Sequence, residues 1–173
     1  SILLLISIVT GVKHQLDDNF SVEWEILNSR ADNSDREVKF TLTLANDKQG
    51  WASIGWRLDP VKYPSGMANA DYIVCYFNQP SNLGCFDGYL LKKGEIAADG
   101  SNWSDYMSRP LLDSHPAVAG SEDIRMISEE SFRNVTSDGT ITKWVFTRKI
   151  NTNDPKDADL SLPNIQAIWA YHR

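Results

Sequence analysis

Residues 20–26 read Phe-Ser-Val-Glu-Trp-Glu-Ile, with an apolar side chain at every second position. A period of two places the apolar residues on one face of a β-strand and the polar residues on the other. After the turn-forming residues 33–35 (Asn-Ser-Asp), the same alternation returns over residues 38–44. Two amphipathic strands joined by a turn predict an antiparallel sheet with one buried face.

The rest of the chain continues this pattern. Further strand-like segments are residues 51–58, 72–77, 86–91, 124–128, the strand after residues 137–140, and 165–172. Residues 137–140 (Ser-Asp-Gly-Thr) are typical of a hairpin turn, and no segment shows helical spacing of apolar residues over several turns. We therefore expect an all-β chain folded as a two-sheet antiparallel β-sandwich. Without an internal repeat or linker, residues 1–173 are expected to form a single domain.

The N-terminal residues 1–12 read Ser-Ile-Leu-Leu-Leu-Ile-Ser-Ile-Val-Thr-Gly-Val. This apolar run has the length of a signal-peptide core but lacks a basic leader, and it is too short to span a bilayer. It is either a signal remnant or an extra strand, and its Ile and Val content suits a strand. An unpaired edge strand of this composition would offer a route to self-association.

Composition narrows the function. A net charge of −6 at pH 7 argues against nucleic acid as a partner. The sequence has no Gly-x-Ser-x-Gly elbow, phosphate loop, His-Glu-x-x-His or paired Cys-x-x-Cys motif. It has only three histidines, His14, His115 and His172. No catalytic residue is assigned, and an electron-transfer or binding domain is favoured over an enzyme acting by itself.

Cys75 and Cys85 flank the turn-rich residues 78–82. On a hairpin the two cysteines would face each other across antiparallel strands, near enough for a disulfide, with two free thiols as the alternative. Glycosylation sequons begin at Asn19, Asn102 and Asn134. Together these features predict a secreted or extracellular domain, or the extracellular side of a membrane-attached protein.

Four segments carry a resemblance to a known family. They are residues 50–56 (Gly-Trp-Ala-Ser-Ile-Gly-Trp), 66–74 (Gly-Met-Ala-Asn-Ala-Asp-Tyr-Ile-Val), 144–148 (Trp-Val-Phe-Thr-Arg) and 165–172 (Ile-Gln-Ala-Ile-Trp-Ala-Tyr-His). Their order and spacing resemble the DOMON family from about Phe20 to the C-terminus. The resemblance implies an immunoglobulin-like two-sheet sandwich with a pocket at one end for haem or sugar.

One branch of that family is the cytochrome branch, found in cellobiose dehydrogenase and in auxin-responsive b-type cytochromes. Its haem b iron takes one Met and one His, and the resemblance implies Met67 and His172 as these axial ligands. Trp51, Trp56 and Tyr72 are expected to line the pocket and shield the porphyrin. Because Met and His fill both axial positions, the iron would transfer one electron rather than activate oxygen.

Other functions stay open. Exposed tryptophans would suit a carbohydrate or small-ligand binding module, and a glycosylated sandwich would also serve as a spacer. Residues 147–157 resemble a segment of dopamine β-monooxygenase-like proteins, which would make the chain an accessory domain of a larger copper monooxygenase. A membrane cytochrome b561 domain or a separate redox partner protein is the expected partner of a haem-bearing form. Asp71 is expected to be structural, accepting hydrogen bonds from backbone donors in a turn.

Overall fold

The computed structural model describes residues 12–27, 36–45, 50–58, 69–79, 82–91, 97–102, 111–162 and 165–172. Within these ranges the regular elements are all β-strands. The strands are β1 (Val12–Gln15), β2 (Phe20–Leu27), β3 (Glu37–Ala45), β4 (Trp51–Arg57), β5 (Ala70–Gln79), β6 (Asn82–Leu90), β7 (Leu111–Leu112), β8 (Ile124–Met126), β9 (Phe132–Thr136), β10 (Gly139–Lys149) and β11 (Gln166–Tyr171). The all-β prediction is confirmed.

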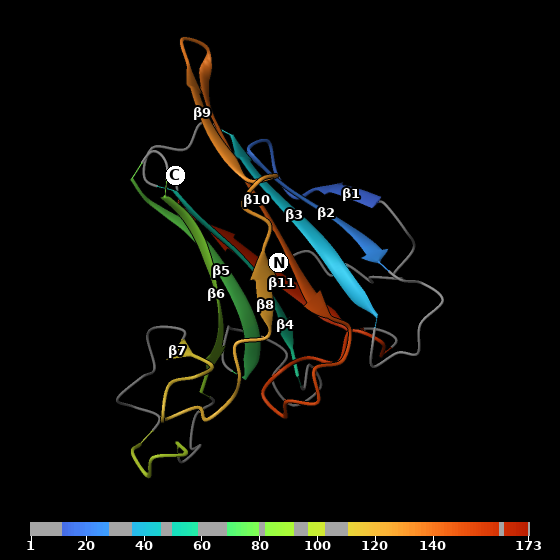
Figure 1. Cartoon of the computed structure of the whole chain (residues 1–173), viewed down its shortest axis with the longest axis vertical. Coiled ribbons are helices and arrows are strands. Elements are labelled where there is room, and N and C mark those ends of the chain that lie inside the picture. The colour runs from blue at the N-terminus through green and yellow to red at the C-terminus, as the bar shows by residue number, and fades with distance from the viewer. Residues whose placement is uncertain are drawn as a thin grey trace.

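The strands form two antiparallel sheets that pack face to face as a sandwich (Figure 1). One sheet has the order β1-β2-β3-β10-β8, with β9 paired to β10, and is called here the β3 sheet. The other has the order β11-β4-β5-β6-β7 and is called the β4 sheet. The β9–β10 hairpin extends beyond the rest of the sandwich in Figure 1. The predicted two-sheet antiparallel sandwich is therefore the observed architecture.

Period-two alternation builds the core between the sheets. Phe20, Val22 and Trp24 of β2 are buried, as the sequence predicts, and so are the alternating apolar residues of β3. The β4 sheet contributes side chains such as Ile54 and Ile73 to the same cluster. Each strand thus turns one set of alternate residues toward the opposite sheet, and burial of that apolar area stabilises the sandwich.

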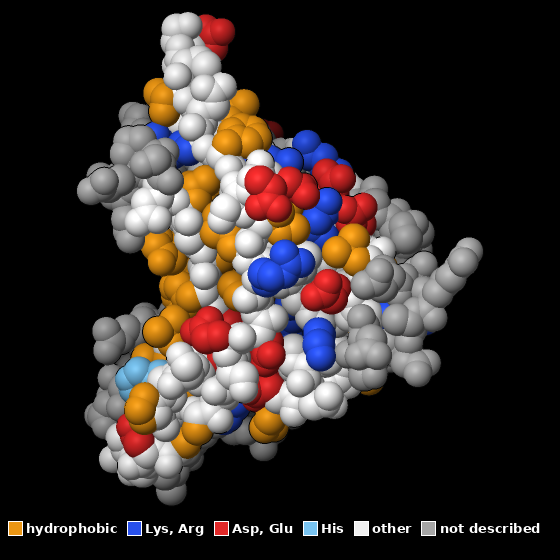
Figure 2. Space-filling view, viewed as in Figure 1, with side chains coloured by type: hydrophobic (Ala, Val, Ile, Leu, Met, Phe, Trp, Pro, Cys, Tyr) orange, Lys and Arg blue, Asp and Glu red, His pale blue; other side chains and the backbone are white. Residues whose placement is uncertain are grey.

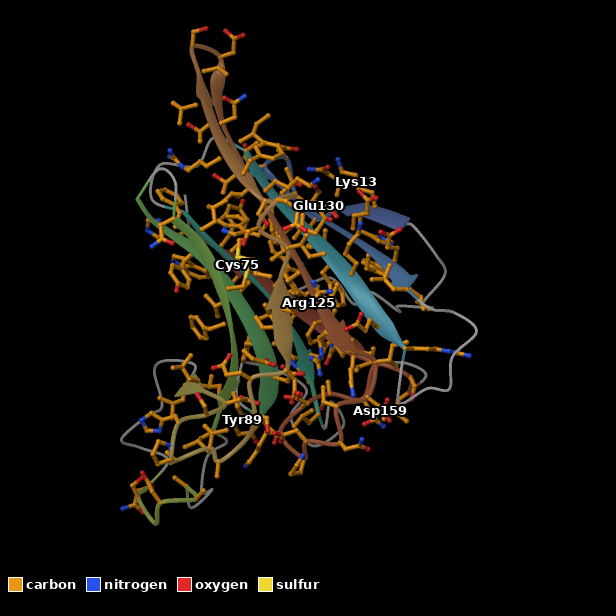
Figure 3. The ribbon with its side chains drawn as sticks, viewed as in Figure 1. Lys13, Cys75, Tyr89, Arg125, Glu130 and Asp159 are labelled. Carbon is orange, nitrogen blue, oxygen red and sulfur yellow. A yellow bond between two sulfur atoms is a disulfide. The ribbon has the colours of Figure 1, made fainter. Side chains whose placement is uncertain are left out.

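Cys75 and Cys85 form the predicted disulfide. They are direct partners in the β5–β6 register, with their Cα atoms 4.0 Å apart, and both belong to the core between the sheets. Figure 3 shows Cys75 beside β5. The bond fixes the alignment of β5 with β6, two inner strands of the β4 sheet.

The expectation for residues 1–12, an extra strand or a signal remnant, stays a prediction, because only Val12 of that range is described. Val12 begins β1, whose residue His14 stacks on Trp24 with ring centroids 4.5 Å apart, whereas residues 1–11 lie outside the described residues. The described part of the chain contains no helix capable of crossing a bilayer. Of the three sequon asparagines, Asn102 and Asn134 are exposed and Asn19 is half-buried before β2.

Candidate functional site

The outer face of the β4 sheet is unusually apolar. Because Ile54 and Ile73 point into the core, their immediate neighbours along each strand point outward. The outward positions are Trp51, Ser53, Gly55 and Arg57 of β4; Ala70, Tyr72, Val74 and Tyr76 of β5; Gly84, Phe86, Gly88 and Leu90 of β6; and Gln166, Ile168 and Ala170 of β11. Arg57 and Gln166 bond to each other at one end, Nη1 to Oε1 at 2.7 Å, and most of the other positions are apolar.

The outer face of the β3 sheet is different. It carries Glu23, Glu25, Lys39 and Thr41, and Lys39 Nζ lies 2.7 Å from Glu25 Oε1. Figure 2 shows charged side chains over this sheet and apolar ones gathered along the side formed by β5 and β6. An antiparallel sheet with only one face in the core normally has a polar outer face. Part of this face is covered, since Ala70, Tyr72 and Leu90 are buried. The half-buried part, which includes Trp51, Val74 and Phe86, is the candidate surface for a ligand or a partner.

Gly55 allows part of this face to close-pack. A Cβ at Gly55 would lie 2.6 Å from the carbonyl oxygen of Asp71 and 2.6 Å from Cδ1 of Tyr72. The Tyr72 ring therefore covers the glycine directly, and Tyr72 is buried in a small cluster with Ala70 and Leu90. Burial raises the pKa of the Tyr72 hydroxyl, so the phenol is neutral. The second glycine of the Gly-Trp-x-x-x-Gly segment is thus explained by this contact.

His172 extends the same face by one position. Its backbone N–H donates to the carbonyl oxygen of Trp51 at 3.0 Å, one step beyond the Tyr171–Ala52 pair of the β11–β4 ladder. Alternation along β11 sets His172 on the same face as Ala170. The residue is exposed, and its imidazole makes no hydrogen bond or ion pair with the part of the chain that the structure describes.

The structure places three of the predicted site residues on one face, with His172 beside Trp51 and Tyr72 farther along the sheet opposite Gly55, and turns a fourth away. Trp51, Tyr72 and His172 belong to the outer face of the β4 sheet, whereas Trp56 points into the core. Trp51 and Trp56 are five positions apart on one strand, so the period of two turns them to opposite faces. The Trp56 ring contacts the Phe40 ring at 5.3 Å between centroids. Met67 lies outside the described residues.

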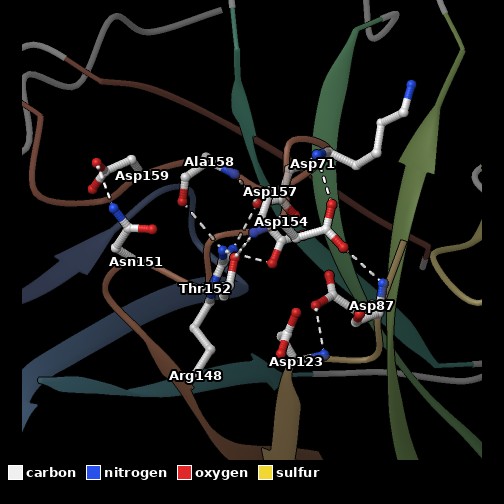
Figure 4. A network of polar contacts seen from close by, with 12 residues as sticks. Asp71, Asp87, Asp123, Arg148, Asn151, Thr152, Asp154, Asp157, Ala158 and Asp159 are labelled. Atoms are coloured by element: carbon white, nitrogen blue, oxygen red, sulfur yellow. Dashed lines mark hydrogen bonds and ion pairs between the residues drawn. The ribbon is translucent and has the colours of Figure 1, made fainter. Parts of the chain in front are cut away.

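A separate, polar cluster lies inside the sandwich, where Arg148 of β10 is fully buried (Figure 4). Its Nη1 donates to Asp71 Oδ2 at 2.6 Å, and its Nη2 lies 3.4 Å from Asp157 Oδ2. Nη2 also donates to the carbonyl oxygen of Ala158 at 3.2 Å, whose own N–H donates to Asp71 Oδ2 at 2.8 Å. Asp71 does accept from a backbone donor, as expected, but from within a strand and not in a turn.

Two more aspartates are buried nearby. Asp87 of β6 and Asp113 after β7 are both almost completely excluded from solvent, and Oδ1 of each accepts no hydrogen bond from a nitrogen or hydroxyl donor of the described residues. Burial raises the pKa of Asp87 to about 10 and that of Asp113 to about 9, with neighbouring carboxylates adding to both shifts. Burial likewise raises the pKa of Asp157 to about 6, although Arg148 opposes that shift.

Sequence reasoning missed Arg148, Asp87, Asp113 and Asp157. A signal for Arg148 was available: it follows Trp144 and Phe146 at a spacing of two, so the alternation places a guanidinium on a core-facing position. Charged residues are almost never fully buried without a partner, so such a position predicts a buried carboxylate. The sequence offers many aspartates, and nothing in it selects Asp71, 77 positions away.

The fold and this outer face define an antiparallel β-sandwich with one apolar surface turned away from its core. The family model for the DOMON domain matches residues 16–172, and the chain belongs to the DOMON family. The resemblance seen in the sequence is thereby confirmed at the level of the family. Comparison with curated proteins and with solved structures finds no match.

Proposed function

We propose that the chain is an extracellular b-type cytochrome domain that transfers single electrons through one haem b. His172 and Met67 would be its axial ligands. The observation that carries the proposal is the unpaired imidazole of His172 on the rim of an apolar sheet face. A porphyrin is a flat apolar macrocycle whose iron takes imidazole and thioether ligands in electron-transfer proteins, so this face and this side chain fit it.

Four described residues of the outer face would shield or contact the haem in this proposal. Trp51 is the cross-strand neighbour of His172 and would limit the access of water to the imidazole side of the cofactor. Val74, Phe86 and Ile168 supply apolar surface beside it. When bound with both axial positions filled, haem supplies one-electron chemistry and offers no open site for oxygen.

Ligation of one iron by both residues would constrain the position of Met67. Asn69, two residues later, is buried at the Arg57 end of β4, where its N–H donates to the carbonyl oxygen of Leu90 at 2.8 Å. His172 is fixed at the Trp51 end of the same strand. These ends are about 20 Å apart at the usual rise per strand residue, farther than a Met side chain extends, so joint ligation of one iron would require the backbone between Leu58 and Asn69 to carry Met67 back over the outer face.

The disulfide supports an oxidising compartment, because such bonds are rare in the cytosol. We extend the proposal to glycosylation at the exposed Asn102 and Asn134 and, in its half-buried turn, at Asn19. A redox partner protein or a membrane cytochrome domain would exchange electrons with the haem.

The deciding experiment is the visible absorption spectrum of the purified chain after haem addition, oxidised and then reduced with dithionite. A low-spin, six-coordinate spectrum with resolved α and β bands is expected. Met67→Ala and His172→Ala are each expected to abolish that low-spin signature, whereas His14→Ala, on the opposite sheet, is the matched control. A low-spin spectrum unchanged in both variants would remove the ligand assignment, and a protein that takes up no haem would remove the function.

A carbohydrate-binding module is the second candidate. Trp51 and Tyr76 are direct partners in the β4–β5 register, and both are half-exposed on the outer face. Adjacent aromatic rings of this kind suit stacking on sugar rings. Quenching of tryptophan fluorescence by oligosaccharides, lost in Trp51→Ala and independent of His172, would favour this function over the cytochrome.

A further inference from the structure

The buried polar cluster has more negative than positive charge. Four of its aspartates, Asp71, Asp87, Asp113 and Asp157, are buried, and the guanidinium of Arg148 is the cation that pairs with them among the described residues. Removing a charge from water is costly unless an opposite charge or a metal compensates it. One guanidinium cannot neutralise four carboxylates, so the ionised cluster lacks positive charge.

The carboxylates fall into two groups that share Asp157. Oxygens of Asp71, Asp87 and Asp157 lie within 4.8 Å of one another, and so do oxygens of Asp113, Asp154 and Asp157. Arg148 pairs with two members of the first group, Asp71 and Asp157. In the part of the chain that the structure describes, neither Asp113 nor Asp154 has an ion pair with Lys or Arg. Asp87 of the first group also has no such ion pair among the described residues, so both groups lack positive charge, and in the second group Asp157 alone meets a cation.

In the second group, backbone donors hold the Asp154 oxygens in place, whereas the buried oxygens of Asp113 and Asp157 are less well satisfied. Asp154 is oriented by two backbone donors, the N–H of Ser121 to Oδ2 at 2.7 Å and the N–H of Lys156 to Oδ1 at 2.8 Å. Among the described residues, Asp113 Oδ1 and Asp157 Oδ1 are buried and accept no hydrogen bond from a nitrogen or hydroxyl donor, and Asp157 Oδ2 has only the 3.4 Å ion pair with Arg148. The Asp113 and Asp157 carboxyl groups also interact with each other. Buried acceptors with no donor are rare in native proteins and indicate an unseen partner such as a water or an ion.

Gly120 shows that two of these carboxylates converge closely. A Cβ at this position would lie 2.9 Å from Asp154 Oδ2 and 3.0 Å from Asp113 Oδ2. The glycine N–H also donates to the carbonyl oxygen of Asp113 at 2.7 Å. The absence of a side chain at Gly120 thus leaves room for carboxylates from the β7–β8 and β10–β11 connections to approach one another.

We propose that Asp113, Asp154 and Asp157 bind one calcium ion, which ties the β7–β8 connection to the β10–β11 connection. A set made only of carboxylate oxygens selects a hard cation, because nitrogen and sulfur ligands are absent from it. Calcium takes six to eight oxygens in flexible geometry and suits ligands contributed by irregular loops, whereas magnesium requires a near-ideal octahedron. Backbone carbonyls and water would complete the shell. The site uses none of the residues proposed for haem.

The experiment is thermal unfolding of the full 173-residue chain in EDTA and in CaCl2. Loop sites of extracellular modules bind calcium with Kd on the order of 10⁻⁴–10⁻³ M. A tenfold excess over Kd is expected to raise Tm by about 3–6 °C for a domain of this size. The double variant Asp113→Asn/Asp154→Asn is expected to lose this rise, while Asp138→Asn, in the exposed β9–β10 turn, is expected to keep it.

The controls separate calcium binding from other effects. Equilibrium dialysis of the unaltered chain is expected to find one calcium per molecule, and Asp154→Asn alone is expected to weaken binding about tenfold or more, because it removes one ligand charge. Three results would each overturn the proposal: no bound calcium, an equal rise of Tm in NaCl of the same ionic strength, or an unchanged calcium response in the double variant. None of these readouts requires haem, so the proposal stands or falls separately from the cytochrome function.

Discussion

Arg148 Nη1 lies 2.6 Å from Asp71 Oδ2, and both side chains are almost wholly excluded from solvent. Arg148 belongs to β10 of the β3 sheet and Asp71 to β5 of the β4 sheet, so the pair joins the two layers through the core. The guanidinium also lies 5.1 Å from the centroid of the Trp56 ring. An ion pair in this position is sensitive to the loss of either partner, because the remaining charge stays buried.

Arg148→Met is expected to destabilise the chain by about 3–5 kcal/mol, since it leaves the Asp71 carboxylate without its counter-charge. Arg148→Lys is expected to restore only part of the loss, because an ammonium cannot reproduce the planar fork that bonds Asp71 and the carbonyl oxygen of Ala158. Urea unfolding measures both. Arg125→Gln, at an exposed position on β8, is the matched control, and a similar loss in this control would contradict the explanation.

Gly55→Ala is expected to destabilise the chain by about 1–3 kcal/mol, because the new methyl group would meet the Asp71 carbonyl oxygen and the Tyr72 ring. Removing the ring in Gly55→Ala/Tyr72→Ala is not expected to recover this loss, since the backbone oxygen remains. Chemical unfolding of the two variants and of Tyr72→Ala alone completes the comparison. Full recovery in the double variant would show that only the side chain opposes the methyl group.

The stability of the metal-free chain is expected to fall as the pH rises. Burial raises the pKa of Asp87 to about 10, above its unfolded value of 3.8, so the folded state favours the protonated carboxyl. That contribution is complete below pH 3.8 and is lost progressively as the pH rises toward 10. Asp113, with a pKa raised to about 9, acts in the same direction.

Unfolding in EDTA at a series of pH values measures this dependence. Asp87→Asn mimics the protonated carboxyl and is expected to flatten the curve, whereas Asp138→Asn in the exposed hairpin turn should leave it unchanged. A curve that keeps its slope in Asp87→Asn would assign the pH dependence to other groups.

Trp51 and Trp56 provide a test of the two faces of β4 that rests on the proposed haem function. Trp51→Ala is expected to keep the six-coordinate spectrum but to lower the reduction potential by tens of millivolts, roughly, because water near His172 favours the ferric state. Trp56→Phe is expected to lower stability without moving the potential, since its ring lies in the core. Redox titration and urea unfolding of both variants give the answer, and a larger potential shift in Trp56→Phe would reverse the assignment.

Alternation together with turn signals predicted the sandwich and the hairpin turn near Asp138. The placement of Cys75 and Cys85 about a turn predicted their disulfide, with two free thiols as the alternative. Alternation did not give the grouping of the aromatics: the predicted pocket included Trp56 with Trp51, although an odd spacing on one strand turns them apart. The buried cluster was also missed. Its members come from β5, β6, β10 and the connections between strands, and what each charge meets depends on packing between distant segments, which no local pattern contains.

The apolar outer face has a further consequence for how the β4 sheet finds its alignment. In most sandwiches a one-residue slip between strands moves polar side chains into the core, and this penalty specifies the register. Residues 72–77 of β5 read Tyr-Ile-Val-Cys-Tyr-Phe, so a slip would exchange one apolar set for another at little cost. Register must then be specified by the positions that tolerate no substitute. The Cys75–Cys85 bond requires direct cross-strand partners, and Asp71 meets Arg148 only in the observed alignment. The disulfide and the buried ion pair, whose charges are costly to remove from water, therefore select one strand pairing out of several that hydrophobicity alone would accept.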